Sequence, residues 1–137
     1  MNRDIKFRVW DVVNKRILDY ADIMTLPMWE VFPGTPEQRP FNVMQYTGLK
    51  DKNGKEIYEG DVLKQVKKSS REGYESSSYD KNNFEVVFKY GSFWLQRPYS
   101  DSVYIRDFPN IDEFVGFECF EIVGNIYENP ELLETEL

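Results

Sequence analysis

Four carboxylates, the side chains in this chain most suited to metal chemistry, lie around one predicted turn: Asp51, Glu56, Glu59 and Asp61. Carboxylate oxygens are ligands that Mg²⁺ and Ca²⁺ prefer. A calcium-binding EF-hand loop that began at Asp51 would need a glycine at its sixth position and a glutamate at its twelfth. Those positions hold Glu56 and Val62. The segment is therefore interpreted as a hairpin turn, and we predict neither a metal nor any other cofactor.

The chain contains no histidine, and its single cysteine is Cys119. Histidine is the commonest general base and the commonest transition-metal ligand, so its absence removes both roles. Cys119 lies in the stretch Phe117-Glu118-Cys119-Phe120, an apolar setting with an acid alongside, and such surroundings disfavour a reactive thiolate. A serine nucleophile would need a lysine as its base, and five serines fall in a segment predicted to be flexible, residues 67–83. We therefore predict no catalytic residues.

A basic segment is the best candidate for contacting nucleic acid. It supplies four cationic side chains: Lys64, Lys67, Lys68 and Arg71. Tyr74 and Tyr79 lie nearby and could stack on bases, as aromatic side chains do in single-strand-binding barrels. Glu72, Glu75 and Asp80 balance these charges locally, so a solvated loop explains the same pattern.

Charge is unevenly distributed along the chain, which carries a net charge of −7. Residues 1–100 hold 16 basic and 14 acidic residues, whereas residues 101–137 hold ten acidic residues against Arg106 alone. An acidic C-terminal third repels phosphate backbones and weakens the nucleic-acid hypothesis. Solubility alone also accounts for such a tail.

Apolar residues crowd into the proline-rich residues 21–40 and into the C-terminal end. Tryptophan is enriched at the energetic centres of protein interfaces, and methionine adapts to varied surfaces. The candidate partner contacts are Met24, Met28, Trp29, Phe32 and Leu133. Left exposed, they would form a larger apolar patch than most soluble monomers tolerate, which predicts a homo-oligomer or another protein partner. Alternatively, the segment closes one end of a barrel and its side chains are core.

Alternation of apolar and polar residues predicts a mainly β chain. Six or seven strands are expected, among residues 5–10, 16–20, 41–46, 62–66, 84–90, 93–96 and 120–127. Four prolines exclude regular structure from residues 21–40, which are interpreted as an apolar loop, and the polar residues 67–83 predict a flexible insertion. Asn129 and Pro130 are typical of a helix start, which predicts a short helix over residues 129–137.

A chain of 137 residues is expected to form one domain with a core of its own. The interior of that domain is predicted to include Phe7, Val9, Val43, Val86, Phe88, Ile122 and Ile126. No apolar stretch approaches the roughly 20 residues of a membrane-spanning helix, and the N-terminal residues lack the apolar region of a signal peptide. The expected location is the cytoplasm.

Three stretches carry a resemblance to a known family: residues 5–11, 44–62 and 123–133. They are similar to the YopX-like family of phage and prophage proteins. The resemblance implies a phage or prophage origin and a small SH3-like β-barrel or roll, with long loops and a short C-terminal helical turn, that covers residues 1–137 as one domain. It implies no catalytic residues.

Two turns within the longest of these stretches have a predicted backbone conformation. Asn53-Gly54 tolerates the positive φ values that tight hairpin turns require. In Glu59-Gly60-Asp61, the resemblance gives the residues a structural role, in which glycine supplies an unusual φ and the aspartate binds backbone amides.

Three functional hypotheses remain open. The leading one is a non-catalytic binding or assembly module that contacts copies of itself or another phage or host protein. The alternative is a nucleic-acid-binding barrel that uses the basic residues 64–71. The third is a carboxylate- or metal-dependent hydrolase.

Overall fold

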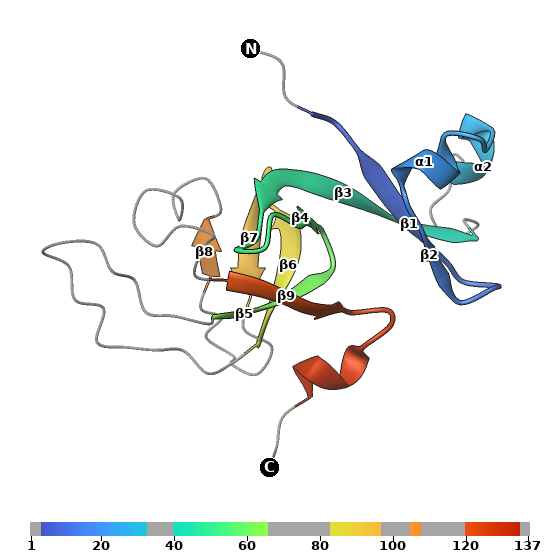
Figure 1. Cartoon of the computed structure of the whole chain (residues 1–137). Coiled ribbons are helices and arrows are strands. Elements are labelled where there is room, and N and C mark those ends of the chain that lie inside the picture. Colours follow the sequence, from blue (N-terminus) through green and yellow to red (C-terminus); the bar gives the residue numbers. More distant parts are fainter. Residues whose placement is uncertain (1–3, 33–39, 66–82, 97–104, 108–119, 135–137) are drawn as a thin grey trace, which may run out of the picture. The chain divides into compact units, whose positions relative to one another are not determined.

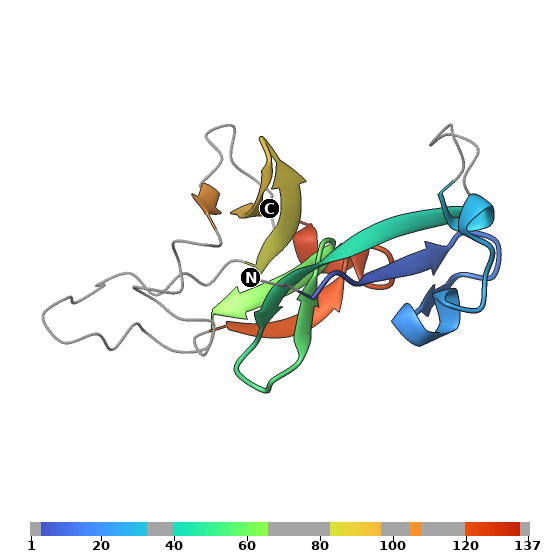
Figure 2. The ribbon, with the colours of Figure 1, turned by 90° about the horizontal axis from the view of Figure 1, so that it is seen from above.

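The computed structural model describes residues 4–32, 40–65, 83–96, 105–107 and 120–134. The chain divides into two compact units, Met1–Tyr46 (unit 1) and Thr47–Leu137 (unit 2), and each is described by itself (Figures 1 and 2). The described elements are mostly strands, so the mainly β fold class is confirmed. A single domain over residues 1–137, and closure into an SH3-like barrel, stay predictions.

Unit 1 is built on an antiparallel sheet in which β1 lies between β2 and β3. The bounds of these strands are β1 (Phe7–Asp11), β2 (Arg16–Leu18) and β3 (Phe41–Lys50). Val9 of β1 stands opposite Leu18 of β2 and Val43 of β3. Directly opposed residues share one face of a sheet, so these three side chains form an apolar row. The second half of β3 belongs to unit 2.

Two single-turn helices follow β2, namely α1 (Tyr20–Ile23) and α2 (Met28–Val31), and both are labelled in Figure 1. The prediction that residues 21–40 contain no regular element is therefore wrong. Pro27 is the N-cap of α2, and its missing N–H breaks no hydrogen bond there because the first N–H groups of a helix have no partner within it. Residues 33–39 lie outside the described part of the chain.

The two helices complete the hydrophobic core of unit 1. Val9, Ile23 and Val31 are buried at its centre. Partly buried apolar residues pack around them: Phe7, Leu18, Tyr20, Leu26, Phe32, Phe41 and Val43. The apolar residues predicted to form a loop are thus divided between this core and the protein surface.

Among its described residues, unit 2 contains a five-stranded antiparallel sheet in the order β8-β7-β6-β5-β9. The strands of unit 2 are β4 (Glu56–Tyr58), β5 (Asp61–Gln65), β6 (Asn83–Lys89), β7 (Ser92–Gln96), β8 (Ile105–Asp107) and β9 (Phe120–Asn125). β4 adjoins the second half of β3, and Figure 2 shows the strands of unit 2 curling. Neither β4 nor β8 was among the predicted strands.

The core of unit 2 forms where β5, β6, β7 and β9 direct apolar side chains to one face. Its buried members are Ile57, Leu63, Phe84, Val86, Leu95 and Phe120. Val86 and Leu95 stand opposite each other in β6 and β7. Phe88 was predicted to be interior, but it is 49% exposed, because it lies at the end of β6 beside the turn.

The C-terminal helix is shorter than predicted. It is a single 3₁₀ turn, η3 (Pro130–Leu133), and residues 135–137 lie outside the described part. Pro130 begins this turn as expected, but the side chain of Asn129 does not cap it. The side-chain oxygen of Asn129 instead accepts the backbone N–H of Asn125 at 3.3 Å.

Candidate functional site

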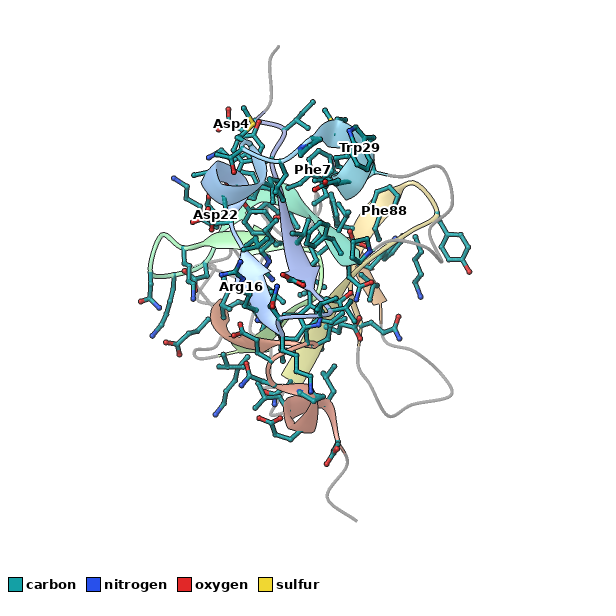
Figure 3. All side chains as sticks on the ribbon, turned by 90° about the vertical axis from the view of Figure 1, so that its right-hand side faces the viewer. Asp4, Phe7, Arg16, Asp22, Trp29 and Phe88 are labelled. Atoms are coloured by element: carbon teal, nitrogen blue, oxygen red, sulfur yellow. The ribbon has the colours of Figure 1, made fainter. Side chains whose placement is uncertain are left out.

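Three large apolar side chains on the helical segment of unit 1 point into solvent, and together they are called here the methionine–tryptophan surface. Met24, Met28 and Trp29 are 66%, 72% and 71% exposed. Met24 directly follows α1, and the other two begin α2; Figure 3 shows the Trp29 side chain on α2. The same segment buries Ile23 and Val31. The core therefore fixes the position of the segment without using these three side chains.

The two other predicted partner contacts have different surroundings. Phe32 is half-buried and packs edge-on against Phe7, with ring centroids 5.4 Å apart and an interplanar angle of 77°. It therefore belongs to the core of unit 1. Leu133 is half-buried at the end of η3 in unit 2.

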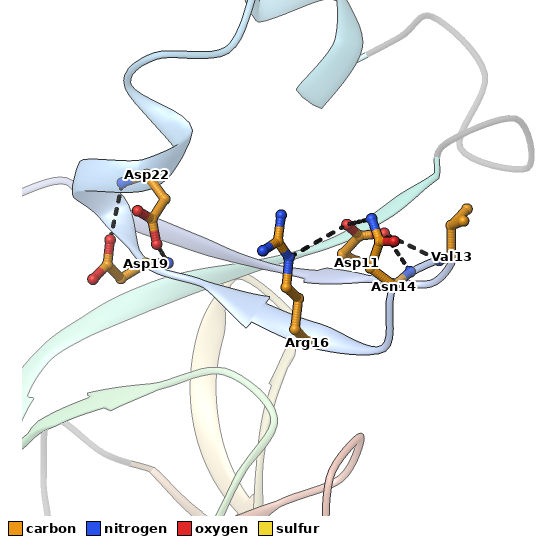
Figure 4. A network of polar contacts seen from close by, with 6 residues as sticks. All are labelled: Asp11, Val13, Asn14, Arg16, Asp19 and Asp22. Carbon is orange, nitrogen blue, oxygen red and sulfur yellow. Dashed lines mark hydrogen bonds and ion pairs between the residues drawn. The ribbon is translucent and has the colours of Figure 1, made fainter.

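Carboxylates flank the methionine–tryptophan surface along the chain. Asp19 and Asp22 form a capping box at the start of α1 (Figure 4). Asp19 Oδ1 accepts the N–H of Asp22 at 2.9 Å, and Asp22 Oδ2 accepts the N–H of Asp19 at 3.3 Å. Glu30 follows Trp29 on α2. Residues 19–32 contain these three acids and no lysine, arginine or histidine, so the segment carries a charge of −3.

The hairpin turn between β1 and β2 is organised by Asp11 (Figure 4). Its Oδ1 accepts the N–H groups of Val13 and Asn14 at 3.0 and 3.1 Å, and its Oδ2 accepts the side-chain amide of Asn14 at 2.8 Å. The Nε of Arg16 lies 3.9 Å from Oδ2. The hydrogen bonds from Asn14, followed by that from Val13 and by the charge of Arg16, outweigh burial and hold the pKa of Asp11 below its ordinary value. Val13 itself is 75% exposed.

Only one of the four candidate nucleic-acid contacts lies in the described part of the chain. Lys64 is exposed on β5, where it stands opposite Asn83 of β6 and Glu121 of β9. An acidic residue at the opposing position offsets its charge. The other three candidates, together with most of the predicted insertion over residues 67–83, lie outside the described residues: Lys67, Lys68 and Arg71.

Asp51, the first of the candidate metal ligands, binds backbone amides. Its side chain is 6% exposed. Oδ1 accepts the N–H groups of Asn53 and Lys55, each at 2.9 Å, and Oδ2 accepts the N–H of Ile122 at 3.1 Å. Gly54 has a φ of 79°, as the predicted hairpin turn requires. Asp51 therefore organises this turn and attaches it to β9.

Asp61 has a similar role in the next turn. It is 1% exposed, and its Oδ2 accepts the N–H of Tyr58 at 2.8 Å. Gly60 has a φ of 88°, donates its N–H to the carbonyl of Val86 at 2.8 Å and accepts the N–H of Ile126 at 2.9 Å. The role predicted for Gly60 and Asp61 is confirmed. Within the described part of the chain, no group of three or more histidine, cysteine or acidic residues is arranged to hold a metal ion.

The end of β9 is fixed by close packing around Gly124. A Cβ placed on Gly124 would lie 2.5 Å from Oδ1 of Asn129 and 2.7 Å from Cδ1 of Leu132. Asn125 is buried, and its Oδ1 accepts the N–H groups of Tyr127 and Glu128 at 3.0 and 2.8 Å. The stretch 123–133 is therefore a compact turn built on β9.

One exposed aromatic residue was not among the predicted site residues. Tyr90 is 88% exposed and has a φ of 52°, and Gly91 after it has a φ of 79°. Because Lys89 and Ser92 are paired across the hairpin, these two residues form its loop. A glycine between two alternating strands is the sequence signal for such a turn.

Two strand-rich units with short helical turns define a small mainly β protein. A comparison with protein-family models matches the YopX protein family over residues 6–134. The chain therefore belongs to this family. None of the helices in the described part of the chain is long and apolar enough to span a membrane.

Among solved structures, the chain is similar to protein EF1440 from Enterococcus faecalis, with 27% sequence identity and a TM-score of 0.62. The match covers 97% of this chain and 100% of that one. No curated protein matches the chain.

Proposed function

We propose that this protein is a non-catalytic binding or assembly module of a phage or prophage that acts in the cytoplasm of the bacterial host. The observation that carries the proposal is the methionine–tryptophan surface, where three large apolar side chains are between 66% and 72% exposed. Tryptophan and methionine are enriched at protein interfaces. Removing apolar surface from water is the main driving force of association. Membership of the YopX family supports a phage or prophage origin.

The arrangement of the segment also supports this function. A binding surface is more effective when its backbone is held in place before the partner arrives, because less conformational entropy is then lost on binding. Here Ile23 and Val31 are buried in the core of unit 1 while their neighbours in sequence face solvent. The capping box of α1 adds two hydrogen bonds to this support.

The first experiment asks whether the exposed side chains are free for contact. The double variant Met28→Gln/Trp29→Ser should change the free energy of unfolding by less than about 1 kcal/mol, because both side chains are exposed. A role in the core would instead cost about 3–5 kcal/mol. Urea unfolding measures the difference, and Val13→Ser is the matched control, since Val13 is an equally exposed apolar residue of unit 1. A loss of several kcal/mol would contradict the proposal.

The second experiment identifies the class of partner. Light scattering coupled to size exclusion measures the particle mass of the full chain at micromolar concentration. A mass above 16.3 kDa that falls to that of the monomer in the double variant, but not in Val13→Ser, identifies a second copy as the partner. A mass of 16.3 kDa in all three proteins assigns the surface to a different protein.

A further inference from the structure

We infer that the methionine–tryptophan surface binds a cationic, amphipathic segment of another protein. This inference rests on the proposed function and names the chemistry of the partner. The apolar side chains would bury the apolar side of the segment, and the flanking acids Asp19, Asp22 and Glu30 would face its lysine and arginine side chains. Charge complementarity of this kind raises the association rate and selects among partners.

The acidic groups are held at defined positions. The reciprocal hydrogen bonds of the capping box, at 2.9 and 3.3 Å, fix the carboxylates of Asp19 and Asp22 at the start of α1. Glu30 lies on α2, whose Val31 is buried in the core. Ile23 of α1 and Val31 of α2 pack against Val9 in the same core, so a partner that covers Met28 and Trp29 meets negative charge on the same side of the sheet.

Arg8 and Arg16, two basic residues in the described part of unit 1, do not neutralise this segment. Residues 19–32 contain no basic side chain. Arg8 lies between Phe7 and Val9 in β1. Those two residues pack into the core beneath the helices, so the alternation of a strand directs Arg8 to the opposite face of the sheet. Arg16 is placed 3.9 Å from the carboxylate of Asp11.

Other occupants fit this surface less well. Symmetric pairing of two copies through the same surface would bring each set of three acids close to an identical set, and like charges across an interface are unfavourable. Nucleic acid and anionic lipid headgroups are repelled for the same reason. An apolar segment without positive charge would leave the acids without counterparts.

The test uses two synthetic helical peptides of about 18 residues, each with leucine on one face. The first carries lysine on the other face, and the second carries glutamate there. Fluorescence anisotropy of the labelled peptides measures their binding to the full chain. The lysine peptide should bind at least about tenfold more tightly than the glutamate peptide, and its affinity should fall as salt is added.

Three variants test separately the apolar contact and the charge contact in this inference. Met28→Gln/Trp29→Ser should abolish binding of the lysine peptide, and Val13→Ser should leave it unchanged. Asp19→Asn/Asp22→Asn/Glu30→Gln should weaken binding by about tenfold and flatten its salt dependence, since it removes three charges. Asparagine is itself a favourable N-cap residue, so this triple variant retains the start of α1. Circular dichroism confirms that each variant is folded.

The outcomes distinguish the inference from the proposed function. Equal binding of the two peptides, or lysine-peptide binding that the triple variant does not weaken, would overturn the cationic partner. A particle mass above 16.3 kDa that depends on Met28 and Trp29 would also overturn it, while the proposed binding function would stand. Loss of folding in the double variant would overturn both.

Discussion

Two acidic residues in unit 2, Asp51 and Asp61, order the backbone of their turns. The carboxylate of Asp51 accepts three N–H groups, and that of Asp61 accepts the N–H of Tyr58. A carboxylate that satisfies buried N–H groups makes strong, charge-assisted hydrogen bonds. Two of the four acids that first suggested a metal site, Asp51 and Asp61, are thus turn-forming residues.

Removing the Asp51 side chain should destabilise the protein strongly. Asp51→Ala would leave three N–H groups without their acceptor, and we expect a loss of about 2–4 kcal/mol in the free energy of unfolding. Asp51→Asn should cost less, because its remaining oxygen can still accept the N–H groups of Asn53 and Lys55. Urea unfolding measures both changes, with the exposed Lys52→Ala as a control in the same turn. An unchanged urea midpoint for Asp51→Ala would show that these three hydrogen bonds contribute little to stability.

Glu85 provides a prediction about pH. Burial, and then the charge of Glu59, raise the pKa of Glu85 above its ordinary value of 4.5, so its charged form destabilises the folded state at neutral pH. Glu85→Gln should therefore stabilise the protein at pH 7, by about 0.5 kcal/mol after allowing for solvent screening. The advantage should be lost as the pH falls below 4.5, where the folded and unfolded wild-type chains are both protonated at this site.

The measurement is a series of urea unfolding curves between pH 7 and pH 4 for the wild type, for Glu85→Gln and for Glu134→Gln. Glu134 is exposed and serves as the matched control. A Glu85→Gln variant that is less stable than the wild type at neutral pH would contradict the assignment.

The helices and strands differed in how well they could be predicted from the sequence. The long strands were predicted because alternation over five or more residues is a clear signal. α1 and α2 were missed because four residues make about one turn, too short to show a helical period. A local signal was present in Asp19 and Asp22, whose spacing of three residues is that of a capping box. β8 has three residues and gave no such signal.

The turn after β9 provides a prediction at this scale. Gly124→Ala would place a methyl group 2.5 Å from Oδ1 of Asn129, a side chain that the N–H of Asn125 holds in place. We expect a loss of about 1–3 kcal/mol, the usual cost of overpacking a well-packed site. Thermal unfolding compares this variant with Val123→Thr, a nearly isosteric change at the neighbouring, partly exposed position. Equal melting temperatures would show that η3 moves freely.

At the scale of the whole molecule, the sequence predicted the fold class better than the distribution of the core. One interior was expected to include Val9 and Val86 together. The structure assigns Val9 to the core of unit 1 and Val86 to the core of unit 2. Alternation shows which face of a strand is apolar, but it does not show which other strand that face will meet.

The candidate site could be predicted only in part, because the sequence pattern does not show how these elements pack. The residue types of Met24, Met28 and Trp29 suggested a contact surface, but composition alone also allowed them to be core. The choice depends on which side of each short helix faces β1, and that follows from packing. Phe32, with the same apolar character, lies against Phe7.

The hydrogen bonds between the two hairpin turns and β9 bear on how the family can diverge. Asp51 holds the N–H of Ile122, Lys52 donates to the carbonyl of Phe120 at 3.0 Å, and Gly60 accepts the N–H of Ile126. These contacts join the stretch 44–62 to β9 and the turn that follows it, across more than fifty intervening residues. The entropy of closing such a loop grows only slowly with its length. Added chain length between the two stretches therefore costs these contacts little. Because Phe120, Ile122 and Ile126 contribute backbone groups, the contacts do not depend on the side chains at these three positions.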